Sequence, residues 1–176
     1  MRMLSIIILL SILFGIVLSQ ESRSSAINRL QPVTIQPILG AGSIFGLRYG
    51  LALGIANNWS IEYARGWDAD INLGGGEYAM TFSGMVCNRY FPIQERLALM
   101  GSLFYLRAYV SQTSNNYTGD FSRYGAMFGI DFSSYNGLGS FVRGGVAFAT
   151  TDYFNGRTSF ALDVGIYYRI HIFGAP

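Results

Sequence analysis

Apolar residues recur at every second position along the last strand-like stretch of the chain. Between Ser159 and Ile172, the bulky residues are Phe160, Leu162, Val164, Ile166, Tyr168, Ile170 and Ile172. The residues between them are small, polar or charged, with Tyr167 as the large exception. Successive side chains of a β-strand point to opposite faces. The pattern therefore predicts a strand with one bulky apolar face and one face of smaller or charged residues.

The same alternation recurs in Leu47–Ala56 and in Tyr124–Phe132. Turn residues separate the alternating runs at Asn57-Asn58, Pro92–Glu95 and Ser134–Gly137, and longer polar loops are predicted at 68–76, 111–121 and 152–157. The expected strands are 33–42, 46–56, 59–67, 77–91, 96–110, 123–133, 139–151 and 158–173. Because closed bacterial barrels take an even number of strands, we expect an all-β fold, an eight-stranded antiparallel up-and-down β-barrel.

The N-terminus has the pattern of a secretory signal peptide. A short basic region, Met1–Met3, precedes an apolar run from Leu4 to Leu18. That run is shorter than the roughly 20 residues of a membrane-spanning helix. We expect a signal peptide at 1–19, with cleavage after Ser19 and cleavage after Ala26 as the alternative. An N-terminal periplasmic segment at 20–32, the barrel at 33–173 and a C-terminal tail at 174–176 follow.

Two kinds of barrel fit this pattern, and they differ in which face meets solvent. A soluble lipocalin-like carrier has a polar outer surface, but charged residues make up 12% of this chain, about half the usual fraction. The non-bulky face is instead Gly and Ala with isolated charges, which suits the crowded interior of eight strands. An Arg at the lipid midplane would cost about 2–4 kcal/mol. These points favour a transmembrane barrel with its bulky face toward lipid.

The charges on the small-residue face have both signs, so they can pair inside the barrel. The predicted lumen charge network is Arg48, Glu62, Glu77, Arg89, Arg123, Asp131, Arg143, Asp163 and Arg169. Cys87 falls on the same inward parity as Arg89, and we expect it to be a buried, inert thiol.

Aromatic residues gather beside the turns and loops, where rings with a polar edge form girdles at membrane interfaces. The predicted aromatic girdle is Trp59, Trp67, Tyr78, Tyr90, Tyr124, Tyr135 and Tyr153.

With these features the sequence resembles the small outer-membrane β-barrel superfamily, which includes opacity-type, OmpW-like and OmpX-like proteins. The phrase Asn57-Asn58-Trp59-Ser60-Ile61-Glu62-Tyr63 looks like a periplasmic turn that enters an ascending strand. The resemblance implies a location in the bacterial outer membrane, insertion by the barrel assembly machinery, and both termini in the periplasm. That machinery usually reads a terminal aromatic residue, whereas here Phe173 is followed by Gly174-Ala175-Pro176.

We therefore expect an integral outer-membrane protein with a structural, surface-interaction or porin-like role and a polar, largely filled lumen. The expected partners are outer-membrane lipid, lipopolysaccharide or its equivalent, and the assembly machinery. A narrow channel for small apolar solutes is the alternative, and a lipid-modifying enzyme or a soluble carrier is less favoured. The near-neutral charge gives no reason to expect nucleic acid. Related enzymes rely on a His near the outer leaflet, whereas His171 ends the last strand, so we expect no enzyme, cofactor or metal.

Overall fold

The computed structural model describes residues 33–55, 58–67, 78–112, 117–134, 136–151 and 154–173. The expected signal peptide at 1–19, the segment at 20–32 and the tail at 174–176 lie outside the described residues. Within the described part, no helix is long and apolar enough to cross a membrane.

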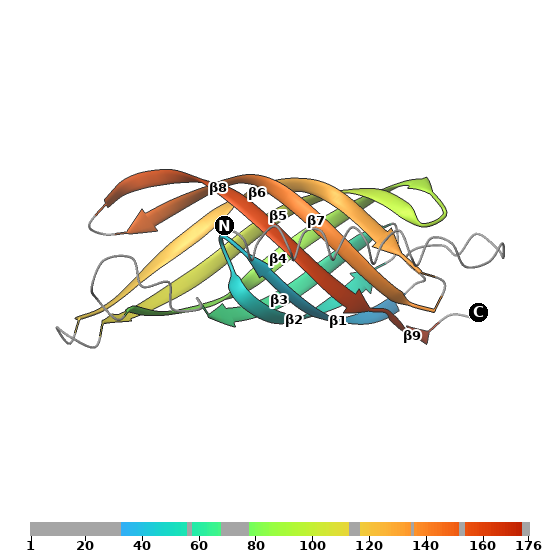
Figure 1. Cartoon of the computed structure of the whole chain (residues 1–176), viewed down its shortest axis with the longest axis horizontal. Coiled ribbons are helices and arrows are strands. Elements are labelled where there is room, and N and C mark those ends of the chain that lie inside the picture. Colours follow the sequence, from blue (N-terminus) through green and yellow to red (C-terminus); the bar gives the residue numbers. More distant parts are fainter. Residues whose placement is uncertain are drawn as a thin grey trace, which may run out of the picture.

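The described residues form an antiparallel sheet that closes on itself (Figure 1). Its strands are β1 (Val33–Gly42), β2 (Gly46–Ile55), β3 (Trp59–Trp67), β4 (Tyr78–Gln94), β5 (Leu97–Gln112), β6 (Tyr117–Ser133), β7 (Leu138–Thr151), β8 (Phe154–Tyr168) and β9 (Ile170–Phe173). From β1 to β8 each strand pairs with the next, and β1 also pairs on its other side with both β8 and β9. Because β8 and β9 are one strand interrupted at Arg169, the fold is a closed eight-stranded up-and-down barrel, as the sequence predicted.

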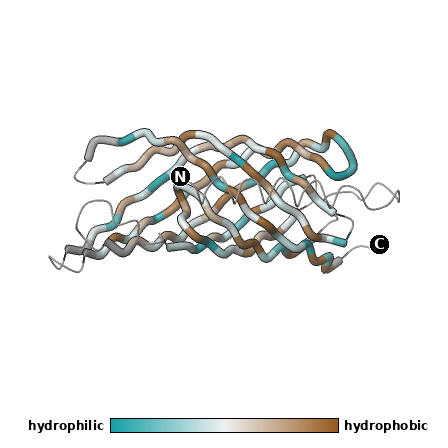
Figure 2. The backbone as a smooth tube through the Cα atoms, in the orientation of Figure 1, coloured by the Kyte–Doolittle hydropathy of each residue, from teal (hydrophilic) through white to brown (hydrophobic). Residues whose placement is uncertain are grey.

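Burial alternates along the strands, so one face of the sheet points into the barrel and the other points outward. In β3 every second side chain is buried, from Ser60 to Gly66, and the others are exposed. Leu103 and Phe128, both on the outer face, are 65% and 73% exposed. Hydrophobic and hydrophilic residues accordingly alternate along the tube in Figure 2. The exposed outer face is therefore largely apolar.

The two ends of the barrel differ. The terminus end holds the first and last paired residues, Val33 and Phe173, and the β2–β3, β4–β5 and β6–β7 turns. The loop end holds the other connections. Strands β1 to β3 have 9 or 10 residues, whereas β4 to β6 have 16 or 17. At the loop end, the wall made by β4 to β6 therefore projects past the short β1–β2 hairpin (Figure 1).

Two of the predicted polar loops are wrong in extent. Strand β5 runs to Gln112 and β6 begins at Tyr117, so most of the expected 111–121 loop is a paired hairpin, with Tyr109 opposite Asp120. Strand β8 likewise begins at Phe154, inside the expected 152–157 loop. Polarity suggested loops there, but backbone pairing in a hairpin does not require apolar side chains.

The β1–β2 turn folds back into the barrel. Its Ile44 and Phe45 side chains are each 1% exposed. Gly46 follows with a φ of 58°, a left-handed conformation that glycine adopts without strain. Ser43 fixes the turn on β8, because its N–H donates to the Leu162 carbonyl at 2.8 Å and its Oγ accepts from the Leu162 N–H at 2.9 Å. The turn thus places two apolar side chains in the bore.

Candidate functional site

Four ionised side chains meet in the middle of the lumen. Arg48 comes from β2, Glu62 from β3, Arg143 from β7 and Asp163 from β8, and each is at most 3% exposed. Strand alternation turns all four inward, and the register sets Arg143 directly opposite Asp163. With two positive and two negative charges, this central network is formally neutral.

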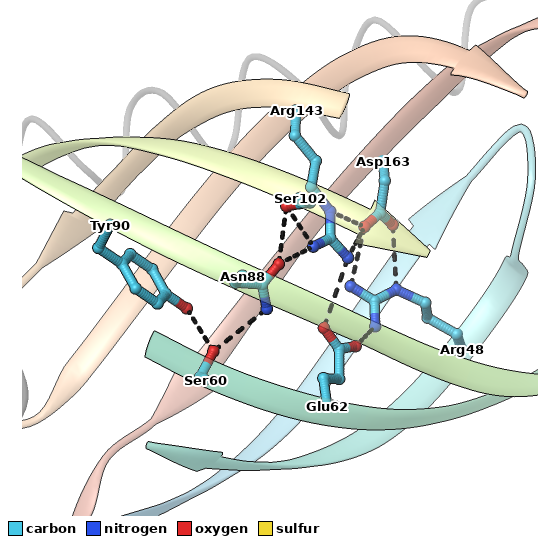
Figure 3. A network of polar contacts seen from close by, with 8 residues as sticks. All are labelled: Arg48, Ser60, Glu62, Asn88, Tyr90, Ser102, Arg143 and Asp163. Carbon is cyan, nitrogen blue, oxygen red and sulfur yellow. Dashed lines mark hydrogen bonds and ion pairs between the residues drawn. The ribbon is translucent and has the colours of Figure 1, made fainter. Parts of the chain in front are cut away.

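Asp163 is the main acceptor of the central network (Figure 3). Its two oxygens accept from Arg48 Nε at 3.0 Å and Arg48 Nη2 at 2.9 Å, a fork-type pair. Arg143 Nε and Nη2 lie 2.7 and 2.6 Å from Asp163 Oδ2. Glu62 pairs with Arg48 through Nη1 and Oε1, and its Oε2 lies 3.5 Å from Arg143 Nη2. Each carboxylate therefore contacts both guanidinium groups.

Neutral polar residues extend the central network across β4 and β5. Arg143 Nη1 donates to Asn88 Oδ1 at 2.8 Å and to Ser102 Oγ at 3.2 Å. Asn88 Nδ2 then donates to Ser60 Oγ, which lies 3.2 Å from the Tyr90 hydroxyl. The sequence prediction missed Asn88 and Ser102. The available signal was their register, since they lie directly opposite each other in the β4–β5 pair.

Aromatic rings enclose the guanidinium groups. Arg48 Cζ lies 4.9 Å from the centre of the Phe45 ring and 5.4 Å from that of Phe141. Arg143 Cζ lies 4.9 Å from the Phe141 ring and 5.9 Å from the Phe45 ring. Such contacts are more favourable where water is excluded.

Glycine makes room for the network at Gly50. A Cβ atom there would lie 2.9 Å from the Tyr63 carbonyl oxygen and 3.2 Å from Glu62 Oε1. A side chain at position 50 would thus crowd the β3 backbone and the Glu62 carboxylate.

Two apolar clusters accompany the central network inside the barrel. One holds Ile44, Phe45, Ala64, Val86, Phe104, Leu106, Met127, Ala147 and Ala161. The other holds Ile38, Ala52, Tyr90, Ala98, Met100, Phe141 and Tyr167. The lumen is therefore built of apolar packing as well as charges, which the sequence prediction did not anticipate.

Three further predicted lumen charges, Asp131, Arg169 and Arg123, have contacts outside the four residues of the central network. Asp131 and Arg169 are buried near Tyr167, and Arg169 Nη2 donates to the Tyr167 hydroxyl at 3.3 Å. Arg123 is half-buried, with its Cζ 5.6 Å from the Phe82 ring, and its Nη1 donates to the Ile44 carbonyl at 3.5 Å. Glu77 lies outside the described residues.

The predicted inward parity of β4 is wrong. Its buried side chains are Phe82, Val86, Asn88 and Tyr90, so Arg89 and Cys87 are on the outer face. Arg89 Cζ lies 5.0 Å from the Trp59 ring there. Tyr90 is 6% exposed and belongs to the lumen, so its assignment to the aromatic girdle is also wrong. Charge does not mark the inward face of β4, because large apolar residues fill this part of the lumen.

Three of the predicted girdle residues are exposed on the outer face. Trp59 lies at the terminus end, whereas Trp67 and Tyr124 lie farther toward the loop end. Two of these rings have outer-face aromatic neighbours, because Trp67 contacts Tyr49 and Tyr124 stacks on Phe148. Tyr135, Tyr153 and the side chain of Tyr78 lie outside the described residues.

The position of Cys87 gives a direct test of the β4 parity. A nitroxide spin label attached to the native Cys87 in lipid vesicles is expected to collide more often with oxygen than with a polar nickel chelate, because oxygen concentrates in lipid. A label placed by Val86→Cys in a Cys87→Ser background is the inward control, with low accessibility to both. Greater access of the nickel chelate to the Cys87 label would contradict the assigned parity.

His171 is exposed in β9, opposite Thr34 of β1 at the terminus end. Among the described residues, no group of three or more His, Cys, Asp or Glu side chains could hold a metal ion.

Comparison with solved structures places this geometry among known barrels. The chain is similar to Neisserial surface protein A (NspA), with 13% identity over 78% of this chain and 94% of that chain and a TM-score of 0.56. Ail, the attachment invasion locus protein of Yersinia pestis, is 12% identical over 78% and 96% of the two chains, with a TM-score of 0.45. A major outer membrane protein from Thermus thermophilus is 12% identical over 80% and 100%, with a TM-score of 0.44.

No family model matches the chain, and no curated protein matches it. At 13% identity the likeness to NspA concerns the fold and not the activity. In its fold, the chain is therefore one of the small eight-stranded β-barrels, as the sequence resemblance predicted.

Proposed function

We propose that this chain is an integral outer-membrane barrel with a structural or surface-interaction role and a lumen closed to solutes. The apolar outer face supports a membrane location, because soluble proteins rarely expose large apolar surfaces to water, whereas a surface of this kind can face lipid. Closure of the sheet supports it as well, since a strand in lipid must satisfy its backbone groups within the barrel. The outer-membrane lipids, including lipopolysaccharide or its equivalent, and the barrel assembly machinery are the partners that accompany this location.

The central network is the main observation in support of a closed lumen. Its hydrogen bonds join β2, β3 and β8 through Arg48, and β7, β4 and β5 through Arg143. Side chains that bridge six strands occupy the path that a solute would take. Moving either guanidinium aside would leave two buried carboxylates facing a single cation, which is costly in a dry interior.

A conductance measurement separates this proposal from a narrow channel. The refolded protein in planar bilayers is expected to give no discrete single-channel steps. Steps in the wild type that vanish when Arg48 or Arg143 is substituted would contradict the closed lumen and favour the channel for small apolar solutes. Arg107→Gln, which changes an exposed charge on the outer wall, is the control that should leave any conductance unchanged.

A further inference from the structure

Two arginines face outward on the wall of the barrel, on either side of a serine. Arg65 of β3 lies opposite Ser83 of β4, and Ser83 lies opposite Arg107 of β5. Directly opposite residues have Cβ atoms about 5 Å apart. The register therefore places the Cβ atoms of Arg65 and Arg107 about 10 Å apart, with the Ser83 hydroxyl between the two side chains.

These residues line a depression of about 420 Å³ in the outer wall. Tyr63 and Tyr109, both about half exposed, also line it, as do Thr81 and Asp120. Hydroxyl groups, guanidinium groups and amphipathic rings thus converge on one shallow surface. Such a combination suits a ligand with one charged part and one apolar part.

The two arginines differ in how their charge is balanced. Arg107 pairs with Asp120, and its Nε donates to Asp120 Oδ2 at 2.8 Å. Arg65 is exposed, and among the described residues it has no ion-pair partner. The depression therefore carries a net positive charge from its described residues.

The place of this charge on the barrel indicates its ligand. On the side of the two arginines that faces the terminus end, the outer face is apolar, with Ile61 in β3 and Leu103 in β5 exposed. An arginine next to hydrocarbon extends its head group toward the interface, where lipid phosphates lie. A guanidinium binds phosphate through a charge-assisted, two-pronged contact.

We infer that Arg65, Ser83 and Arg107 bind the phosphorylated head group of a lipid in the leaflet at the loop end. Arg65 provides the charge, Arg107 adds donors beside its pair with Asp120, and the Ser83 hydroxyl donates between them. Tyr63 and Tyr109 pack against the apolar part of the lipid. This inference rests on the proposed membrane location.

The test uses the full refolded barrel and lipid A as the probe, in its diphosphorylated and dephosphorylated forms. Protein in phosphatidylcholine vesicles doped with each form is extracted, and the lipid it retains is measured by native mass spectrometry. The wild type is expected to retain the diphosphorylated form about tenfold more. Arg65→Gln is expected to abolish most of that preference, and Arg65→Lys to restore part of it.

Controls make the outcome specific. Arg96→Gln removes the same charge in the β4–β5 turn at the terminus end and should leave the preference unchanged. Equal retention of both forms by the wild type, or an equal loss in Arg96→Gln, would overturn the lipid site. Displacement of the lipid by inorganic phosphate at equal concentration would overturn a lipid source in favour of free phosphate.

Failure of the membrane location would look different. In that case the wild type would not float with the vesicles at all, whichever lipid they contain. Each variant is first checked for a folded barrel by its heat-dependent gel mobility, so loss of folding is not taken for loss of binding.

Discussion

Asp163→Ala is expected to lower the free energy of unfolding by about 3–5 kcal/mol, since it breaks a buried ion pair from one side. The carboxylate accepts from both Arg48 and Arg143 and is 0% exposed. Its removal leaves two buried cations facing the single charge of Glu62. Urea unfolding in lipid vesicles, followed by the fluorescence of Trp59 and Trp67, measures the change.

The matched control removes a carboxylate from an exposed pair. Asp120→Ala breaks the ion pair with Arg107. The Arg107 side chain is 70% exposed and the Asp120 side chain is 48% exposed. An exposed pair contributes at most about 1 kcal/mol, so the variant should unfold near the wild-type urea concentration. If both variants lost a similar free energy of unfolding, burial would not be what makes the ion pairs of the central network stabilising.

Leu103→Arg is expected to lower the stability of the membrane-embedded barrel by about 2–4 kcal/mol, the cost of an Arg at the bilayer midplane. Leu103 is 65% exposed on the outer face, six residues from the start of β5 and four before Arg107. The same unfolding assay in vesicles measures the effect, and folding yield into bilayers gives a second reading.

Phe148→Arg provides the depth control. Phe148 is exposed on β7 only three residues before the strand ends at the loop end. Near the interface the same substitution should cost about 0–1 kcal/mol. If Leu103→Arg and Phe148→Arg lower the free energy of unfolding by the same amount, the cost of a charge on the outer face does not depend on its depth. The proposed membrane location would then lose its main support.

The alternation of side chains was enough to predict most strands and the closed fold. Where one face was bulky and the other small, as in β2 and β8, the inward residues Arg48 and Asp163 followed directly. Strand β4 was different, because its two faces have similar composition. Its lumen face carries Phe82 and Val86, and its outer face carries Arg89. There the register with β3, which composition does not determine, sets the inward side.

The central network also depends on relations that no single strand contains. Arg48 and Asp163 are separated by 115 residues, and they meet only because β1 joins β8. The contribution of Asn88 and Ser102 likewise depends on the β4–β5 register. The sequence therefore predicted which charges turn inward better than it predicted which of them touch.

The seam that closes the barrel has a consequence for the order of folding. Strand β1 pairs with β8 from Ile38 to Gly42 and with β9 at three further positions, whereas β4 and β5 pair along nearly their whole length. Loop-closure entropy disfavours contacts between distant segments until neighbouring hairpins exist. The hairpins should therefore form first and the seam last.

In that order, the ion pair between Arg48 and Asp163 can form only when the seam closes, because the two residues lie on opposite sides of it. Before closure, both side chains keep water or lipid head groups as partners. Afterwards they are buried, and reopening the seam requires separating two ionised groups. The buried ion pair between Arg48 and Asp163 thus stabilises the short seam, and a chain whose seam is still open lacks it.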